Sequence, residues 1–144
     1  LLHRLQYTFG LSGFVITWIR SYLTNRSSFV KIDSSSSPCT TIDTGVPQGS
    51  VLGPLLFVLF IAPIANVINP GQLNNNNFVS FHQYADDTQL YIGTNSSSLA
   101  HQVALIESCT QRVNDWLLNN GLHLNPSKSE AIAFLNPRSK QLLF

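Results

Sequence analysis

Two adjacent carboxylates, Asp86 and Asp87, are the residues of this chain best suited to chemistry. They follow Tyr84 and Ala85 and stand between two runs, 78–84 and 88–92, whose aromatic and β-branched composition is typical of strands. Like charges at close range repel, and Mg²⁺ removes this cost because it prefers carboxylate oxygens as ligands. The four residues 84–87 therefore predict the tip of a metal-binding β-hairpin. A polar turn is the alternative, because Asp is common in turns.

The charge pattern around the acidic pair favours a metal site. No Asp, Glu, Lys or Arg occurs between Thr44 and Ala85, so the pair is the first charge after a long neutral stretch. No glycine follows the pair, and the Asp-Gly chemistry of a tight primed turn is therefore missing. Both observations lower the weight of the turn interpretation.

A second segment with chemical potential is the glycine- and proline-rich run Gly45-Val46-Pro47-Gln48-Gly49-Ser50, which leads into an apolar stretch. Glycine allows a ligand to approach the main chain closely. We expect Ser50 to cap a helix whose first turn contains Pro54, since proline is best tolerated there. The N-terminus of such a helix favours anions, nucleotide phosphates among them.

Three segments in this order carry a family resemblance. They are residues 45–50, residues 84–87, and the run Trp116-Leu117-Leu118-Asn119-Asn120-Gly121-Leu122-His123-Leu124-Asn125-Pro126-Ser127-Lys128-Ser129-Glu130. Together they resemble the reverse transcriptases of non-LTR (LINE-type) retrotransposons, over residues 1–134 or so.

The resemblance implies an RNA-directed DNA polymerase that transfers nucleotides to a primer 3′-hydroxyl. Its implied partners are an RNA template, a DNA primer and deoxynucleoside triphosphates, and its implied cofactor is a pair of Mg²⁺ ions, with Mn²⁺ as a substitute. Asp86 would be the principal metal ligand. Asp87 would be an auxiliary ligand or would orient the hairpin, because successive strand residues point to opposite faces.

The resemblance also implies roles for residues around the metals. Lys128 would supply a proton or a positive charge to the departing pyrophosphate, and a solvated lysine in a turn is an equally open interpretation. Tyr84 would lie under the primer terminus, and a core aromatic of the strand is equally open. The residues implied to contact substrate or template are Pro47, Gln48, Gly49, Tyr84 and Ala85.

Hydrophobic spacing and turn residues predict the elements that position these segments. The expected helices are 1–6, Gly13–Leu23 with Ser12 as its cap, a buried helix 51–68, and a helix from Leu99 that ends before Gly121. On the second helix, Val15, Ile19 and Tyr22 are expected on one face. Besides the hairpin, the expected strands are 29–32, 40–44, 122–124 and 131–135, with a flexible serine-rich loop at 34–37 and a mobile loop at 66–77.

This order predicts an α+β fold, an antiparallel sheet with helices on one face. By resemblance it is a partial polymerase palm with adjoining fingers-side elements over residues 1–144, of which 136–144 lead toward a thumb. Such polymerases carry a further metal-binding aspartate before a helix like 1–4, whereas Asp33 and Asp43 come after that helix. We therefore expect the first catalytic strand to be missing and the 144-residue chain to be inactive alone. The alternatives are a decayed or domesticated remnant that binds nucleic acid or protein without catalysis, and a structural fragment.

Composition narrows the remaining possibilities. A net charge of +1 gives no basic patch, so most cations that grip nucleic acid are expected outside this segment. Cys39 and Cys109 have no metal-ligand spacing, which favours a reduced intracellular protein, placed by family in the nucleus and cytoplasm.

The uncharged stretch 51–68 is long enough for a bilayer. Gly53, Pro54 and Pro63 interrupt it, and no Lys or Arg flanks it. A buried helix, and no membrane partner, is therefore expected.

Overall fold

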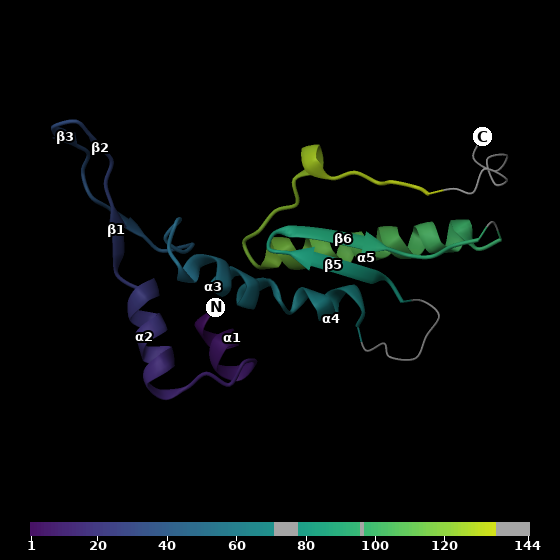
Figure 1. Cartoon of the computed structure of the whole chain (residues 1–144), viewed down its shortest axis with the longest axis horizontal. Coiled ribbons are helices and arrows are strands. Elements are labelled where there is room, and N and C mark those ends of the chain that lie inside the picture. The colour runs from purple at the N-terminus through teal and green to yellow at the C-terminus, as the bar shows by residue number, and fades with distance from the viewer. Residues whose placement is uncertain (71–77, 96, 135–144) are drawn as a thin grey trace. The chain divides into compact units, whose positions relative to one another are not determined.

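The computed structural model describes residues 1–70, 78–95 and 97–134, and the chain divides into two compact units, Leu1–Ala62 and Pro63–Phe144. The first unit contains α1 (Leu2–Tyr7), α2 (Gly13–Leu23), β1 (Arg26–Ser28), β2 (Lys31–Ile32), β3 (Ser35–Ser36), β4 (Thr40–Ile42) and α3 (Leu52–Ile61). The second contains α4 (Ile64–Ile68), β5 (Ser80–Tyr84), β6 (Asp87–Tyr91), α5 (Leu99–Asn119) and the short 3₁₀ helix η1 (Pro126–Lys128) (Figure 1). Helices combined with small antiparallel sheets confirm the predicted α+β class.

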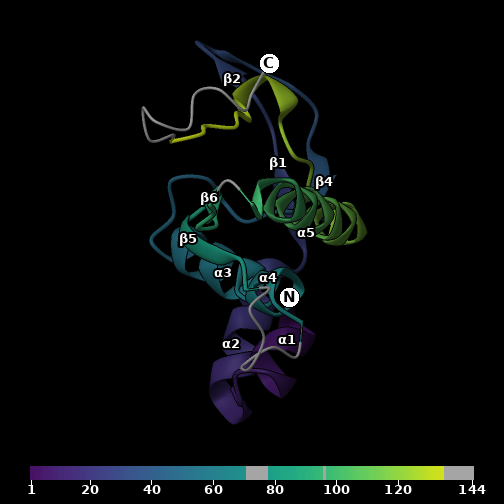
Figure 2. The same cartoon turned by 90° about the vertical axis from the view of Figure 1, so that its right-hand side faces the viewer.

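The core of the first unit lies where α1, α2 and α3 meet, and α1 and α2 lie side by side in Figures 1 and 2. Its buried side chains are Leu5, Ile16, Ile19 and Leu56. The bounds predicted for α2 are confirmed, but the predicted inner face is wrong in one position. Val15 is 47% exposed, and Ile16 is buried instead, on the same face as Ile19.

A two-stranded ribbon follows α2. β1 pairs with β4 and, further out, β2 pairs with β3, all antiparallel. The predicted flexible loop at 34–37 is therefore wrong. Ser35 and Ser36 pair with Ile32 and Lys31, and Asp33, whose φ is +51°, makes the turn. Of the strand predicted over 29–32, only Lys31 and Ile32 are strand, as β2, and β1 ends before it at Ser28.

The continuous helix predicted over 51–68 is wrong. α3 ends at Ile61 and α4 begins at Ile64, because Pro63 lacks the N–H that would continue the helix and its ring clashes with the preceding turn. α3 buries one face, through Leu56, whereas Leu55 and Val58 are about half exposed. Within the described residues, no helix is long and apolar enough to cross a membrane.

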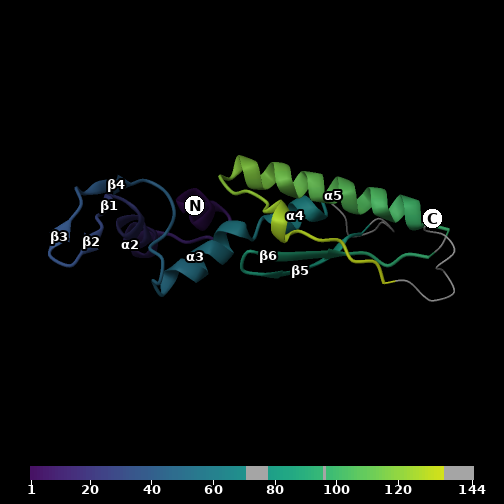
Figure 3. The ribbon, with the colours of Figure 1, turned by 90° about the horizontal axis from the view of Figure 1, so that it is seen from above.

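The second unit is built on α5. α4 packs against it, and Figures 1 and 3 show the β5–β6 hairpin running along the same helix. Its buried side chains are Ile64, Ile68, Val79, Cys109, Val113 and Leu117. Arg112 of α5 fixes the C-terminal end of α4. Its Nε donates to Val67 O (3.2 Å) and its Nη2 to Ile68 O (3.2 Å).

An amide side chain joins α4 to the hairpin. Asn69 Nδ2 donates to Val79 O (2.8 Å), and Val79 N–H donates to Asn69 Oδ1 (3.1 Å). This pair of hydrogen bonds brings together two residues ten positions apart, just after α4 and just before β5. The mobile loop predicted over 66–77 begins too early, because residues 66–68 belong to α4, and its residues 71–77 lie outside the described residues.

The end of α5 confirms the predicted role of Gly121. Its φ is +70°, its N–H donates to Leu118 O (3.1 Å), and Leu122 N–H donates to Leu117 O (2.9 Å). These two bonds make the Schellman motif, which satisfies carbonyls that the helix leaves open.

Beyond α5 the predicted strands 122–124 and 131–134 are wrong. These residues are irregular, and the Pro126 turn is the 3₁₀ helix η1, in which Asn125 Oδ1 accepts from Ser127 N–H (3.1 Å). Neither segment pairs with a strand among the described residues. Apolar composition in so short a run is not enough to make a strand. Leu135 and the segment 136–144 lie outside the described residues.

Candidate catalytic hairpin and substrate loop

The acidic pair lies at the tip of a hairpin, as predicted. β5 and β6 pair through five positions, from Ser80 opposite Tyr91 to Tyr84 opposite Asp87. Ala85 and Asp86 form the two-residue connection. The pair is therefore divided, with Asp86 in the turn and Asp87 as the first residue of β6.

The turn carries a backbone conformation that is unusual for its residue. Ala85 has a φ of +52°, in the left-handed region where a Cβ costs about 1–2 kcal/mol. A positive φ at this position is what a two-residue hairpin turn demands. Residues held in such conformations concentrate at functional sites, because the surrounding structure must maintain them.

The two carboxylates are available to a ligand. Both are exposed, and among the described residues no hydrogen bond or ion pair engages them. Mg²⁺ is commonly bound by one or two carboxylates, with water and substrate phosphate completing its shell, and Asp86 and Asp87 fit that donor set. Within residues 1–70, 78–95 and 97–134 no group of three or more His, Cys, Asp or Glu side chains gathers around a common point. That the two aspartates bind metal therefore stays a prediction, and further ligands would have to come from outside these residues.

The outward face of the hairpin combines an aromatic hydroxyl with an acid. Tyr84 is 77% exposed and lies directly opposite Asp87, and residues paired across two strands present their side chains on the same face. The interpretation of Tyr84 as a core aromatic is therefore wrong. The inward face of the hairpin consists of the partly buried Phe81, Gln83, Thr88 and Leu90.

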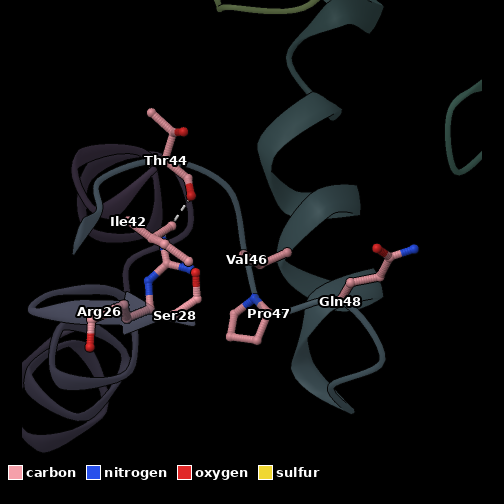
Figure 4. A pocket seen from close by; sticks show the side chains of 8 residues that line it. Arg26, Ser28, Ile42, Thr44, Val46, Pro47 and Gln48 are labelled. Carbon is pink, nitrogen blue, oxygen red and sulfur yellow. Dashed lines mark hydrogen bonds between the residues drawn. The ribbon is translucent and has the colours of Figure 1, made fainter. Parts of the chain in front are cut away.

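The predicted substrate loop lies in the first unit. Pro47, Gln48 and Gly49 are exposed, and Gly45 and Gly49 have φ values of +71° and +78°. The loop borders a pocket of about 430 Å³, shown in Figure 4. The lining residues are Arg26, Ser27, Ser28, Ile42, Thr44, Val46, Pro47 and Gln48.

Ser50 is predicted to cap α3, but the N-cap residue is Val51, which makes no side-chain capping bond. Ser50, one residue earlier, still binds the first turn of the helix, because its Oγ accepts from Gly53 N–H (3.1 Å). Pro54 lies in the first turn, as expected. Gly53 is closely packed, because a Cβ there would lie 3.1 Å from Ser50 Oγ, which would have to shift by a few tenths of an ångström.

Sequence reasoning missed two residues that hold this loop. Arg26 Nη2 donates to Thr44 O (3.0 Å) and to Gly45 O (2.7 Å), and the Tyr22 hydroxyl donates to Ser50 Oγ (2.6 Å). The acceptors are two main-chain carbonyls and a serine 18 to 28 positions away, so no local pattern marks these contacts.

Lys128 is the last residue of η1, in the same unit as the hairpin. Its side chain is exposed, and its main-chain N–H donates to Asn125 O (3.1 Å). The site residues thus fall into two groups. Tyr84, Ala85, Asp86 and Asp87 are adjacent on one hairpin of the second unit, which also holds Lys128, whereas Pro47, Gln48 and Gly49 belong to the first unit.

Comparison with known proteins places these features in a family. The family model described as reverse transcriptase (RNA-dependent DNA polymerase) matches residues 4–142. The chain is 29% identical to the RNA-directed DNA polymerase from mobile element jockey of Drosophila melanogaster, over 82% of this chain and 13% of that protein.

Two further relatives from Drosophila melanogaster agree with this match. A probable RNA-directed DNA polymerase from transposon BS is 33% identical over 77% of this chain and 12% of its own length. A probable RNA-directed DNA polymerase from transposon X-element is 31% identical over 81% and 12%. The chain thus spans about an eighth of the length of these relatives. No solved structure matches it significantly.

Proposed function

Because this chain belongs to the reverse transcriptase family, as its motifs predict, we propose that it is part of an RNA-directed DNA polymerase of a non-LTR retrotransposon. The observation that carries the proposal is the hairpin tip. It presents two exposed, unpaired aspartates on a turn whose conformation the flanking strands enforce.

The proposed reaction is nucleotidyl transfer on an RNA template. A primer 3′-hydroxyl attacks the α-phosphate of a deoxynucleoside triphosphate, and pyrophosphate leaves. Two Mg²⁺ ions, or Mn²⁺ in their place, would supply charge stabilisation at the attacking and leaving oxygens. Asp86 and Asp87 would hold them with carboxylate oxygens that no other group of the described residues engages.

Tyr84 and Ala85 complete the hairpin's part in the site. The exposed Tyr84 ring lies on the same face as Asp87 and offers a flat, hydroxyl-bearing surface to the primer terminus. Ala85 has a small side chain, so it adds little bulk at the turn and does not obstruct the Tyr84 ring.

The loop of residues 47–49 would contact the nucleotide and the template. The Gln48 amide both donates and accepts, which suits a base or sugar edge. Gly49, with its positive φ, allows the main chain to approach the ligand, and Pro47 limits the freedom of the residues before Gln48.

Lys128 would act on the departing pyrophosphate. Its exposed ammonium group can meet the negative charge that develops on the leaving group. Among the residues that the structure describes, it is also one of three exposed cations. Three arginines, Arg4, Arg26 and Arg112, donate to backbone carbonyls of this chain.

The remaining cations set how strongly this segment can bind phosphate. Within the described residues the exposed ones are Arg20, Lys31 and Lys128. Because each phosphate contact contributes about one unit to the salt dependence of binding, these three cations would contribute at most about three units to the salt dependence of nucleic-acid binding. We further propose that the chain alone does not polymerise, and that the complete enzyme acts in the nucleus and cytoplasm.

The test replaces Asp86 by Asn in a full-length polymerase that carries this segment. The amide keeps the shape and removes the charge that holds Mg²⁺, so single-turnover extension on an RNA template should fall by roughly 10³-fold or more, several kcal/mol of transition-state stabilisation. Asp87→Asn should cost as much or less, Gln48→Ala should mainly weaken nucleotide use, and Lys128→Ala should have the smallest effect.

Asp115→Asn is the matched control. Asp115 is an exposed acid on α5 that accepts from Gln111 Nε2 (2.8 Å), and its loss removes the same charge away from the hairpin. Circular dichroism checks folding. Extension by Asp86→Asn within a few-fold of the parent enzyme would show that the hairpin does not bind the metals.

A further inference from the structure

The loop of residues 44–50 is attached at both ends to one short stretch of chain, residues 22–26. Arg26 holds the beginning of the loop through two carbonyls, and Tyr22 holds its end through Ser50. These two residues lie four positions apart, at the end of α2 and the beginning of β1. The same turn of chain therefore fixes the two ends of the segment that carries Gln48.

Arg26 makes its contacts with a rigid group. Nη2 donates to Thr44 O and Gly45 O, and Nε donates to Leu23 O (3.0 Å), in the last residue of α2. The planar guanidinium can serve the three carbonyls at once, which a lysine ammonium on its flexible stem does not reproduce. Figure 4 shows Arg26 beside Thr44, with the Gln48 amide pointing away from both.

Tyr22 holds the other end of the loop through a chain of hydrogen bonds. Its hydroxyl donates to Ser50 Oγ, which accepts in turn from Gly53 N–H, while Ser50 N–H donates to Pro47 O (3.2 Å). The helix start and the loop are thereby tied to α2 by one hydroxyl. Between the two attachments Val46 packs against the core of the first unit.

We infer that Arg26 and Tyr22 are positioning residues that hold Gln48 in place for the incoming nucleotide. The inference rests on the proposed function, in which Gln48 contacts nucleotide or template. Three of the five N–H donors of Arg26 point at main-chain carbonyls, so the residue acts through the loop and is not a phosphate ligand. Loosening either attachment lets Gln48 sample more positions, which weakens nucleotide binding before it slows chemistry.

The kinetic test uses Arg26→Lys and Tyr22→Phe in the full-length polymerase. Each should raise the KM for nucleotide roughly tenfold, the value of one good hydrogen bond, and should change kcat less than threefold. The controls are Arg20→Lys, an exposed arginine of α2, and Tyr7→Phe, whose ring is 70% exposed and stacks on His3. Both controls should leave KM and kcat unchanged.

A double-mutant cycle separates positioning from a general loss of stability. If Arg26 acts through Gln48, then Arg26→Lys combined with Gln48→Ala should be no worse than Gln48→Ala alone. If the double variant instead shows the product of the two single effects on nucleotide KM, the inference is overturned. It is also overturned by a salt dependence of template binding that falls by about one unit in Arg26→Ala, since that result marks a phosphate contact.

A structural measurement distinguishes a failure of this inference from a failure of the proposed function. In the 144-residue chain, Arg26→Lys and Tyr22→Phe should speed amide hydrogen exchange at Ser50 and Gly53 at least tenfold, and Arg20→Lys should not. Faster exchange with unaltered Gln48→Ala kinetics would mean that the loop is held but does not contact substrate, so the proposed role of Gln48 would fail. Unchanged exchange would overturn the positioning role itself.

Discussion

Replacing Arg112 by Met should weaken the attachment of α4 to α5 in the unit that contains the candidate hairpin. Arg112 lies on α5 and donates to Val67 O and Ile68 O, the last carbonyls of α4, and its Nη1 donates to Ser108 Oγ (2.9 Å). A helix leaves its final carbonyls without partners, and a cation at this end also meets the negative end of the helix dipole. Methionine keeps most of the apolar stem and removes every donor.

The size of the effect follows from the bonds that are lost. Each contributes about 1 kcal/mol, because the side chain is partly exposed and water replaces some of what is lost. The two carbonyl bonds therefore give a free energy of unfolding lower by about 2 kcal/mol, or a Tm lower by roughly 6–8 °C for a chain of this size. Arg112→Lys should lose about half as much, since it keeps the charge and cannot span both acceptors.

Urea and thermal unfolding of the 144-residue chain, followed by circular dichroism, measure these differences. Arg20→Met is the control. Arg20 is exposed, and its replacement removes the same charge from a helix of the first unit. It should change the free energy of unfolding by less than about 0.5 kcal/mol. A loss equally small for Arg112→Met would refute the reasoning and would mean that water satisfies the ends of α4 equally well.

The remaining predictions concern a thiol and a helix end. Burial raises the pKa of the Cys109 thiol, so Cys39, which is exposed, should react with iodoacetamide in the native chain and Cys109 only after unfolding. The stability that the neutral Cys109 thiol contributes should be complete below the thiol's unfolded pKa and lost as the pH rises through its folded pKa, a loss that Cys109→Ala should abolish. Gly121→Ala should cost about 1 kcal/mol of unfolding free energy because of the positive φ, whereas Gly93→Ala, with no neighbour within 4 Å of its added Cβ, should be neutral. Equal effects at the two glycines would contradict this explanation.

Elements with a local signature could be predicted from the sequence. α2 has the predicted bounds because Ser12, Gly13 and an apolar period of three to four residues mark it, and Gly121 ends α5 because a left-handed residue is needed there. The hairpin followed from two strand-like runs around an acidic pair. Pro63 is a residue that interrupts helices, but the apolar residues on both sides of it favoured the prediction of one continuous helix.

The candidate site could be predicted in part, for a physical reason. Asp86, Asp87 and Gln48 are recognised by their own side-chain chemistry and by the motifs around them. Arg26 and Tyr22 act on main-chain carbonyls and a serine hydroxyl, groups that almost any sequence supplies, so nothing in their neighbours identifies their partners. Contacts of this kind become visible only when the backbone is placed.

The hydrogen-bonded pair of Asn69 and Val79 makes the polypeptide between them an insertion point. Since the Asn69 side chain joins the two ends with two hydrogen bonds, we expect α4 and β5 to keep their relative positions when residues are added between them. Doubling that length adds only about 0.6 kcal/mol of closure entropy. We therefore expect a peptide tag inserted after Pro70 to leave the hairpin in place.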